Sequence, residues 1–97
     1  MLDEGAALAL RRGGKSLLPI GIREIRGNFG VGAPVRCLDE AGGVIGVGLT
    51  NYGSHEIEHI MGRHSDEIEK FIGYKHSDEV IHRNNFVLAD DMAQLKE

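Results

Sequence analysis

Apolar and polar residues near the start of the chain follow the pattern of a short helix. Residues 3–12 are mostly strong helix formers, and Asp3 is a residue type that caps helix N-termini well. Gly13 and Gly14 follow, and glycine readily adopts the left-handed conformation that ends helices. The sequence therefore predicts a helix over residues 3–12.

Later segments show the shorter, two-residue period that is typical of strands. Residues 16–27 are expected to be extended, with a bulge or bend near Arg23 and Glu24, where the period slips by one residue. Gly46 and Gly48 share one face of their strand, so we expect another backbone or a bulky side chain to pack closely there. The other predicted elements are strands over 34–38, 44–50 and 86–88, a hairpin connection over 39–43 and a turn over 77–81.

An eleven-residue pattern occurs twice in the middle of the chain and predicts a pair of short helices. Each copy starts at a serine, Ser54 or Ser65, which we expect to be the N-cap, and acidic residues follow in the first turn. Each copy stops at a glycine, Gly62 or Gly73. The apolar residues expected in the core are Ile57, Ile60, Met61, Ile68, Phe71 and Ile72, together with Phe29 from a glycine-rich turn.

The order of these elements indicates the fold class. A helix, then strands, two helices and a closing strand are typical of a mixed α+β, β-rich domain, and we expect a small open barrel. The 97 residues are enough for one domain. Residues 1–88 are expected to form it, and residues 89–97 are expected to be a polar tail that frays or forms a loose helix.

The charge is distributed unevenly along the chain. The net charge is −4, but residues 1–4 carry −2, residues 5–38 carry +5 and residues 39–97 carry −7. Two interpretations stay open: the basic part guides an RNA or an acidic protein surface, or its charges are simply solvated. The candidate contact residues are Arg11, Arg12, Lys15, Arg23 and Arg26.

One motif suggests metal chemistry. His55 to His59 matches H-E-x-x-H, which on a helix can hold zinc with Glu56 as a general base. A catalytic zinc needs a third protein ligand, and Gly62 ends the helix before His64. We therefore interpret this helix as solvent-facing, and we predict no catalytic, cofactor-binding or metal-binding residue in the chain.

Cysteine usage and hydropathy indicate the environment. Cys37 is the single cysteine, so the chain forms no internal disulfide, and its apolar strand suggests a buried structural thiol. No stretch approaches the roughly 20 apolar residues of a membrane helix. A cytoplasmic location without membrane contact is expected.

Several motifs resemble a known family. The opening resembles PUA domains, which are small pseudo-barrels of RNA-modifying enzymes; its motifs are Asp3-Glu4-Gly5-Ala6 and Gly14-Lys15-Ser16-Leu17-Leu18-Pro19-Ile20-Gly21-Ile22. Two further motifs resemble more specifically the C-terminal PUA domains of the bacterial glutamate 5-kinase family; they are Ile60-Met61-Gly62-Arg63 and Val80-Ile81-His82-Arg83-Asn84-Asn85. The resemblance extends from residue 2 to about residue 88.

The resemblance implies a PUA-like pseudo-barrel with an N-terminal helix and a short helix pair. It also implies a parent enzyme that uses ATP and Mg²⁺ to phosphorylate the glutamate side-chain carboxylate, the first step of proline biosynthesis. The nucleotide and glutamate residues of that family map onto no position here, so Met1 is interpreted as an introduced start on a segment of a longer protein. No cofactor is therefore expected in this segment.

The resemblance leaves two roles open for the domain. In the first, it is a non-catalytic regulatory and interaction module whose partner is the kinase domain of the same full-length chain, in a homo-oligomeric parent. In the second, it binds RNA, because PUA domains of RNA-modifying enzymes grip RNA through the first helix, the glycine-rich turn after it and a nearby strand. The five candidate bases lie in that region of the sequence.

Overall fold

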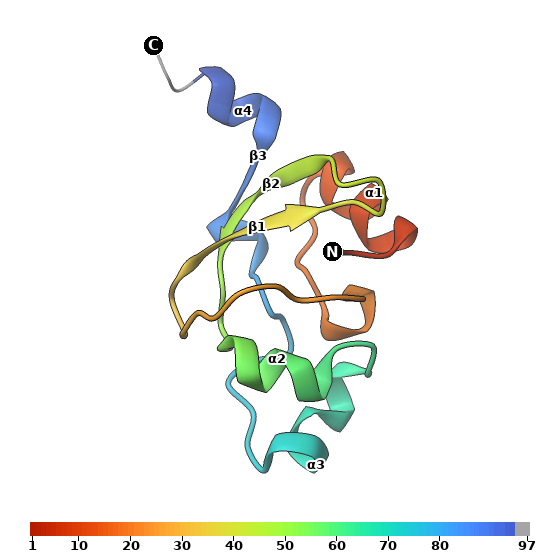
Figure 1. Cartoon of the computed structure of the whole chain (residues 1–97), viewed down its shortest axis with the longest axis vertical. Coiled ribbons are helices and arrows are strands. Elements are labelled where there is room, and N and C mark those ends of the chain that lie inside the picture. The colour runs from red at the N-terminus through yellow and green to blue at the C-terminus, as the bar shows by residue number, and fades with distance from the viewer. Residues whose placement is uncertain (95–97) are drawn as a thin grey trace.

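The centre of the fold is a three-stranded antiparallel sheet in the order β1-β2-β3 (Figure 1). The computed structural model describes residues 1–94. β1 spans Pro34–Leu38, β2 spans Val44–Leu49 and β3 spans Phe86–Leu88. The mixed α+β prediction is confirmed, and the predicted strands lie where expected, with β2 one residue shorter at its end.

The first helix follows the sequence prediction closely. α1 spans Glu4–Arg12, and the Asp3 carboxylate accepts a hydrogen bond of 2.7 Å from the backbone N–H of Ala6. Gly13 ends the helix with a φ of 82°. Ala7 and Leu10 are buried, so the apolar side of α1 contributes to the core.

The segment after α1 differs from the prediction. Instead of one extended strand over residues 16–27, Pro19–Gly21 forms the 3₁₀ helix η1. One interruption lies at Pro19, whose ring fixes φ and removes a donor. At the predicted bend, the consecutive N–H groups of Arg23 and Glu24 both donate to the Met1 carbonyl, at 2.9 and 3.3 Å, as two residues opposite one do in a bulge. Two isolated bridges flank η1; they join Leu17 to Ile81 and Leu2 to Ile22.

A bulge in the β1–β2 pair explains a burial that strict alternation does not predict. Cys37 pairs with Gly46 and Leu38 pairs with Val44, so Ile45 has no partner on β1. Residues at a bulge depart from the two-residue alternation. Two consecutive residues, Ile45 and Gly46, are therefore both buried, and Ile45 is only 2% exposed.

The close approach predicted at two glycines of β2 is confirmed. A Cβ added at Gly46 would lie 2.2 Å from the Val87 carbonyl oxygen and 2.5 Å from Phe86 Cζ. A Cβ added at Gly48 would lie 2.6 Å from Ile81 Cγ2. Only glycine leaves room for β3 and the residues before it to pack on this face of β2.

The repeated pattern forms a helix pair, but serine does not cap either helix. The pair consists of α2 (Ser54–Ile60) and, in the second copy, the 3₁₀ helix η2 (Ser65–Glu67) followed by α3 (Ile68–Ile72). Each serine is the first residue of its helix, so the cap position falls one residue earlier, at Gly53 and at His64. The Glu56 carboxylate accepts from the N–H of Gly53 at 2.6 Å, and Glu67 accepts from the N–H of His64 at 3.3 Å.

The two serines connect the helix pair to other segments. Ser54 Oγ donates to the carbonyl of Phe29 at 3.3 Å and accepts from its N–H at 3.1 Å. Ser65 Oγ donates to the carbonyl of Asp78 at 2.7 Å. The expected caps are thus long-range contacts, and the repeat uses its glutamates for capping.

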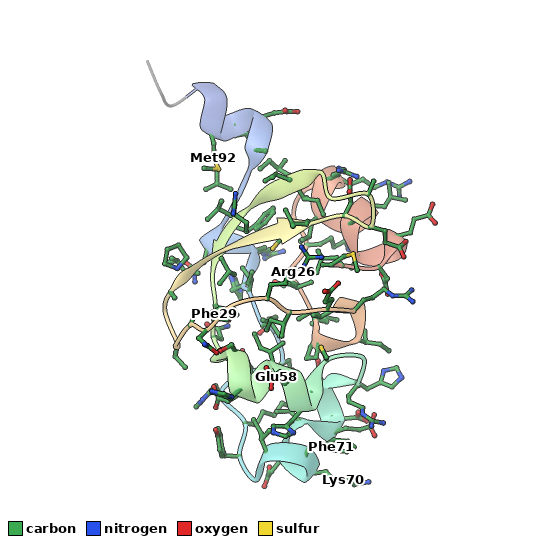
Figure 2. All side chains as sticks on the ribbon, in the orientation of Figure 1. Arg26, Phe29, Glu58, Lys70, Phe71 and Met92 are labelled. Carbon is green, nitrogen blue, oxygen red and sulfur yellow. The ribbon has the colours of Figure 1, made fainter. Side chains whose placement is uncertain are left out.

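Most of the predicted core residues are inside, with one clear exception. Ile57, Ile60 and Ile68 are buried, and three others pack against the core partly buried; these are Met61, Ile72 and Phe29. Phe71 is 39% exposed, so its assignment to the core was wrong. Its ring points outward from α3 (Figure 2), and the guanidinium of Arg63 lies 4.5 Å from the ring centroid.

The C-terminal residues continue from β3 into a further short helix. η3 spans Arg83–Asn85 and α4 spans Ala89–Gln94. In Figure 1, α4 extends away from the sheet beyond β3. The predicted polar tail is therefore helical as far as residue 94, and its residues 95–97 lie outside the described residues.

The packing at Gly46 leads to a stability prediction. Gly46→Ala should destabilise the chain by about 1–3 kcal/mol, because overpacked sites force backbone shifts, and the backbone oxygen of Val87 cannot move aside alone. The measurement is urea unfolding followed by circular dichroism. The matched control is Gly30→Ala, since a Cβ there meets nothing within 4 Å. Equal stability of the two variants would contradict this account.

Candidate interaction surface

The five candidate bases lie on two neighbouring parts of the fold. Arg11 and Arg12 are in the last turn of α1, and Lys15 follows in the loop. Arg23 and Arg26 belong to the irregular segment after η1, which runs between β1 and α2 (Figure 2). All five residues are exposed. The fold therefore presents each of them to solvent, as an interaction surface requires.

Acidic residues neutralise part of this surface. Arg11 Nη2 lies 2.5 Å from Asp39 Oδ2, and Arg23 Nη1 lies 3.7 Å from Glu40 Oε2. Both acids come from the turn between β1 and β2. Arg26 pairs with a local acid, Glu24, at 3.2 Å. Three of the five bases are thus paired with carboxylates. Two of these carboxylates belong to the acidic segment 39–97 and the third, Glu24, to the basic segment itself.

The turn between β1 and β2 is built around one of these acids. Asp39 Oδ1 accepts from the N–H of Ala41 at 3.0 Å and from the N–H of Gly43 at 2.7 Å. The hydrogen bond from Arg11, followed by the one from Gly43, lowers the pKa of the Asp39 carboxyl. Asp39 therefore stays ionised and ties the end of α1 to the hairpin.

Two of the candidate bases have no ion-pair partner in the described part of the chain. Arg12 and Lys15 flank the Gly13-Gly14 turn, and neither lies within salt-bridge distance of an acid in residues 1–94. The structure therefore does not bring the five bases together as one uncompensated cationic patch. Whether any of them contacts RNA or protein stays a prediction.

The H-E-x-x-H residues occupy different environments. His55 and His59 are exposed on α2, and His64 is exposed at the start of η2. Within residues 1–94, no group of three His, Cys, Asp or Glu side chains is placed to hold a metal ion. Glu56 is instead engaged at the N-terminus of its own helix.

A polar network that the sequence did not predict surrounds Glu56. Its carboxylate accepts from the hydroxyl of Tyr74 and lies 3.1 Å from His76 Nε2. The Tyr52 hydroxyl, which belongs to a fully buried residue, donates to the Ser77 carbonyl at 2.6 Å. It also accepts from the backbone N–H groups of His76 and Ser77 at 2.9 and 3.0 Å. The network fastens residues 74–77 to the start of α2.

The electrostatics of this network favour an ionised Glu56. Burial alone would raise the pKa of the Glu56 carboxyl, but hydrogen bonds from Tyr74, from the N–H of Gly53 and from His76 outweigh it. The pKa of Glu56 is therefore lowered, and the same hydrogen bond raises the pKa of Tyr74. One signal was present in the sequence: a glutamate three residues after the true cap occurs in both copies of the repeat.

A cleft of about 640 Å³ lies beside β1. One wall is β1 itself, and the other is formed by residues 24–29. Core side chains form its floor, among them Leu17, Ile57 and Ile81. The sequence did not predict this cleft, because its walls come from segments whose pairing the sequence does not specify.

Cys37 faces the core at this cleft and is buried, as predicted. Burial raises the pKa of the Cys37 thiol to about 11 from its ordinary value of 9.0. Since the thiolate is the reactive form, this cysteine is chemically inert near neutral pH. Its contribution is apolar packing.

Three comparisons place the chain among known proteins. The family model described as "PUA domain" matches residues 1–72. The chain is 58% identical over 92 residues to a glutamate 5-kinase of Meiothermus ruber, which covers 95% of this chain and 24% of that protein. It is 50% identical over 91 residues to a glutamate 5-kinase of Thermus thermophilus, covering 94% of this chain and 25% of that protein. The chain thus spans about a quarter of the length of the curated relatives it matches.

A solved structure agrees with the fold. The crystal structure of a PUA domain from Aeropyrum pernix K1, described as a tartrate complex, superposes with a TM-score of 0.63 at 24% identity. The match covers 96% of this chain and 46% of that one. In residues 1–94, no helix is both long and apolar enough to cross a membrane.

The raised pKa of Cys37 leads to a reactivity prediction. In the native chain at pH 7.5, iodoacetamide should alkylate Cys37 at least about a hundredfold more slowly than in guanidinium chloride, since folding lowers both the access to the thiol and its thiolate fraction. Because the thiol of Cys37 has a higher pKa in the folded chain than in the unfolded chain, the free energy of unfolding should also fall as pH rises from about 9 to about 11. Mass spectrometry measures the alkylation. Similar rates in both states would contradict burial of the thiol.

The lowered pKa of Glu56 leads to a prediction about acid stability. A depressed carboxyl pKa stabilises the native state above the unfolded value of about 4.3, and that contribution is lost as pH falls through the native pKa. Glu56→Gln should therefore be less stable than the parent chain at pH 7, with the difference shrinking below about pH 4. Thermal unfolding across pH measures it, with Glu58→Gln on the exposed side of α2 as the control. A gap that stays constant down to about pH 2 would contradict the assignment.

Proposed function

The chain belongs to the PUA domain family, and from this premise we propose that it is the non-catalytic interaction and regulatory module of a glutamate 5-kinase. The observation that supports the proposal is the share of each chain that the match covers. Nearly all of this chain aligns, at high identity, with about a quarter of a much longer enzyme. A module of this kind acts through what it contacts, and we take its partner to be the kinase domain of the same full-length chain.

In this proposal the chemistry belongs to the rest of the parent. The parent transfers the γ-phosphoryl group of ATP to the side-chain carboxylate of glutamate, with Mg²⁺, in the first step of proline biosynthesis. Residues 1–94 contain no group of three His, Cys, Asp or Glu side chains placed to hold a metal ion, and the proposal assigns the Mg²⁺ to the rest of the parent. We also propose a cytoplasmic location and a homo-oligomeric parent, in which the module adjusts assembly and feedback inhibition by proline.

The charges favour a protein partner over RNA. A protein that binds RNA through phosphates needs cations that are free to replace counterions. Arg11, Arg23 and Arg26 already face carboxylates, and two of these carboxylates, Asp39 and Glu40, would lie beside any bound phosphate and repel it. The same mixture of charges and exposed apolar groups is ordinary for a protein–protein interface.

The proposal predicts the effect of removing the module. A glutamate 5-kinase lacking the segment that corresponds to residues 2–97 should keep its phosphotransferase activity, because no catalytic residue is lost. Its oligomer size, its inhibition by proline, or both should change. Light scattering and inhibition curves measure these properties, with the full-length Glu69→Gln variant as the control. Retention of both oligomer size and proline inhibition would contradict the proposal.

RNA binding is the other outcome to be tested, and the isolated chain suffices for it. A mobility-shift titration with a structured RNA should show no affinity at low or at physiological salt. A salt-sensitive affinity that falls in the double variant Arg12→Gln, Lys15→Gln would favour the RNA-binding role instead. The salt slope would then count the phosphates that are contacted.

A further inference from the structure

The outer edge of β1 carries backbone groups that point into the cleft. The N–H of Thr50 donates to the carbonyl of Ala33, so by alternation along β1 the backbone groups of Val35 and Cys37 also point toward β2. Arg36 and Leu38 therefore point theirs away from β2. The Leu38 carbonyl accepts from the N–H of Leu2 at 2.9 Å, so this edge already takes one backbone hydrogen bond from another segment.

Next to that contact, the edge is open. β1 is the terminal strand of the sheet, and the N–H and C=O of Arg36 have no strand beside them in residues 1–94. The opposite wall is open as well, since no backbone hydrogen bond joins residues 25–28 to any other described residue. Two unpaired stretches of backbone thus face each other across a cleft of about 640 Å³.

The side chains around this gap alternate in character. Val35 and Cys37 lie on the core face of β1, above an apolar floor, and Arg36 lies on the opposite, exposed face. No acid in the described part of the chain pairs with Arg36. A strand placed here would therefore turn every second side chain toward apolar groups and the others toward a free cation.

We propose that this cleft binds an extended peptide segment of a partner protein, which adds a strand to the outer edge of β1. The segment alternates apolar residues, directed at the floor, with acidic residues beside Arg36. Main-chain hydrogen bonds to the edge supply affinity and the alternating side chains supply specificity. This proposal names the contact surface of the interaction module and so rests on the function proposed above.

A second copy of this chain fits the cleft poorly. Antiparallel pairing of two β1 edges would bring Arg36 close to its own counterpart, and like charges opposite each other destabilise a pair of strands. Pro34 also contributes no N–H to such a pair. A strand from another protein that alternates acidic and apolar residues avoids the repulsion, and it meets one such proline instead of two.

The experiment uses the 97-residue chain, labelled with ¹⁵N, and a capped pentapeptide that alternates valine and glutamate. Peptide at millimolar concentration should shift the amide signals of residues 35–38 and 25–28, and should slow hydrogen exchange of the Arg36 amide at least tenfold. The control peptide has the same side chains with all internal amides N-methylated, so it cannot donate to the edge. It should produce no saturable shifts.

Two variants test the mechanism of binding. Arg36→Pro removes the edge N–H and should abolish the shifts, whereas Arg36→Gln keeps the N–H and should weaken binding roughly threefold through loss of charge. Proline is tolerated on an outward-facing edge position, and the N-methylated peptide tests the same hydrogen bonds if that variant fails to fold.

Three results would overturn the proposal. The first is an Arg36 amide that is already protected from exchange without peptide, which would mean that the two walls pair with each other. The others are an absence of shifts at saturating peptide, or shifts confined to residues outside the cleft. Because this titration needs no kinase domain, its failure is separable from a failure of the deletion experiment on the full-length enzyme.

Discussion

The close approach of β3 and Ile81 to the core face of β2 joins distant parts of the chain. With no side chain at Gly46 and Gly48, the backbone of β3 and the side chain of Ile81 lie directly against the strand. Ile81 is in turn bridged to Leu17, in the segment that follows α1. A single constraint, the absence of two Cβ atoms, thus connects the beginning, middle and end of the chain around one core.

Features that depend on neighbouring residues could be predicted from the sequence, and features that depend on distant ones could not. The Asp3 cap, the Gly13 stop and the three strands each follow from a few consecutive residues. The prediction that Ser54 caps its helix was wrong because its hydroxyl bonds to Phe29, 25 positions away, and a local pattern contains no information about that partner. The prediction that Phe71 lies in the core was wrong because the side of this five-residue helix that faces the core is too short to bury all of its apolar residues.

The candidate surface illustrates the same limit for charge. Along the sequence, the basic residues of the first third are separate from the acidic residues that follow. The β1–β2 hairpin reverses the chain and places Asp39 beside Arg11, 28 positions earlier. Surface ion pairs of this kind contribute little to stability, but they decide how much cationic charge the surface offers to a ligand. The linear distribution of charge therefore overstated the basic character of this surface.

The edge of β1 is unpaired over a short stretch and carries features that limit association with other strands. Both properties restrict what can bind there. Unpaired strand edges invite uncontrolled association, and proteins limit it with proline, bulges and charged residues. Pro34 stands at one end of the free edge, the bulge at Ile45 distorts the other end of the ladder, and Arg36 lies between them. These devices leave an accessible stretch of only a few residues. A stretch that short excludes open-ended sheet growth and still suffices for a brief extended segment whose side chains match the apolar floor and the free guanidinium.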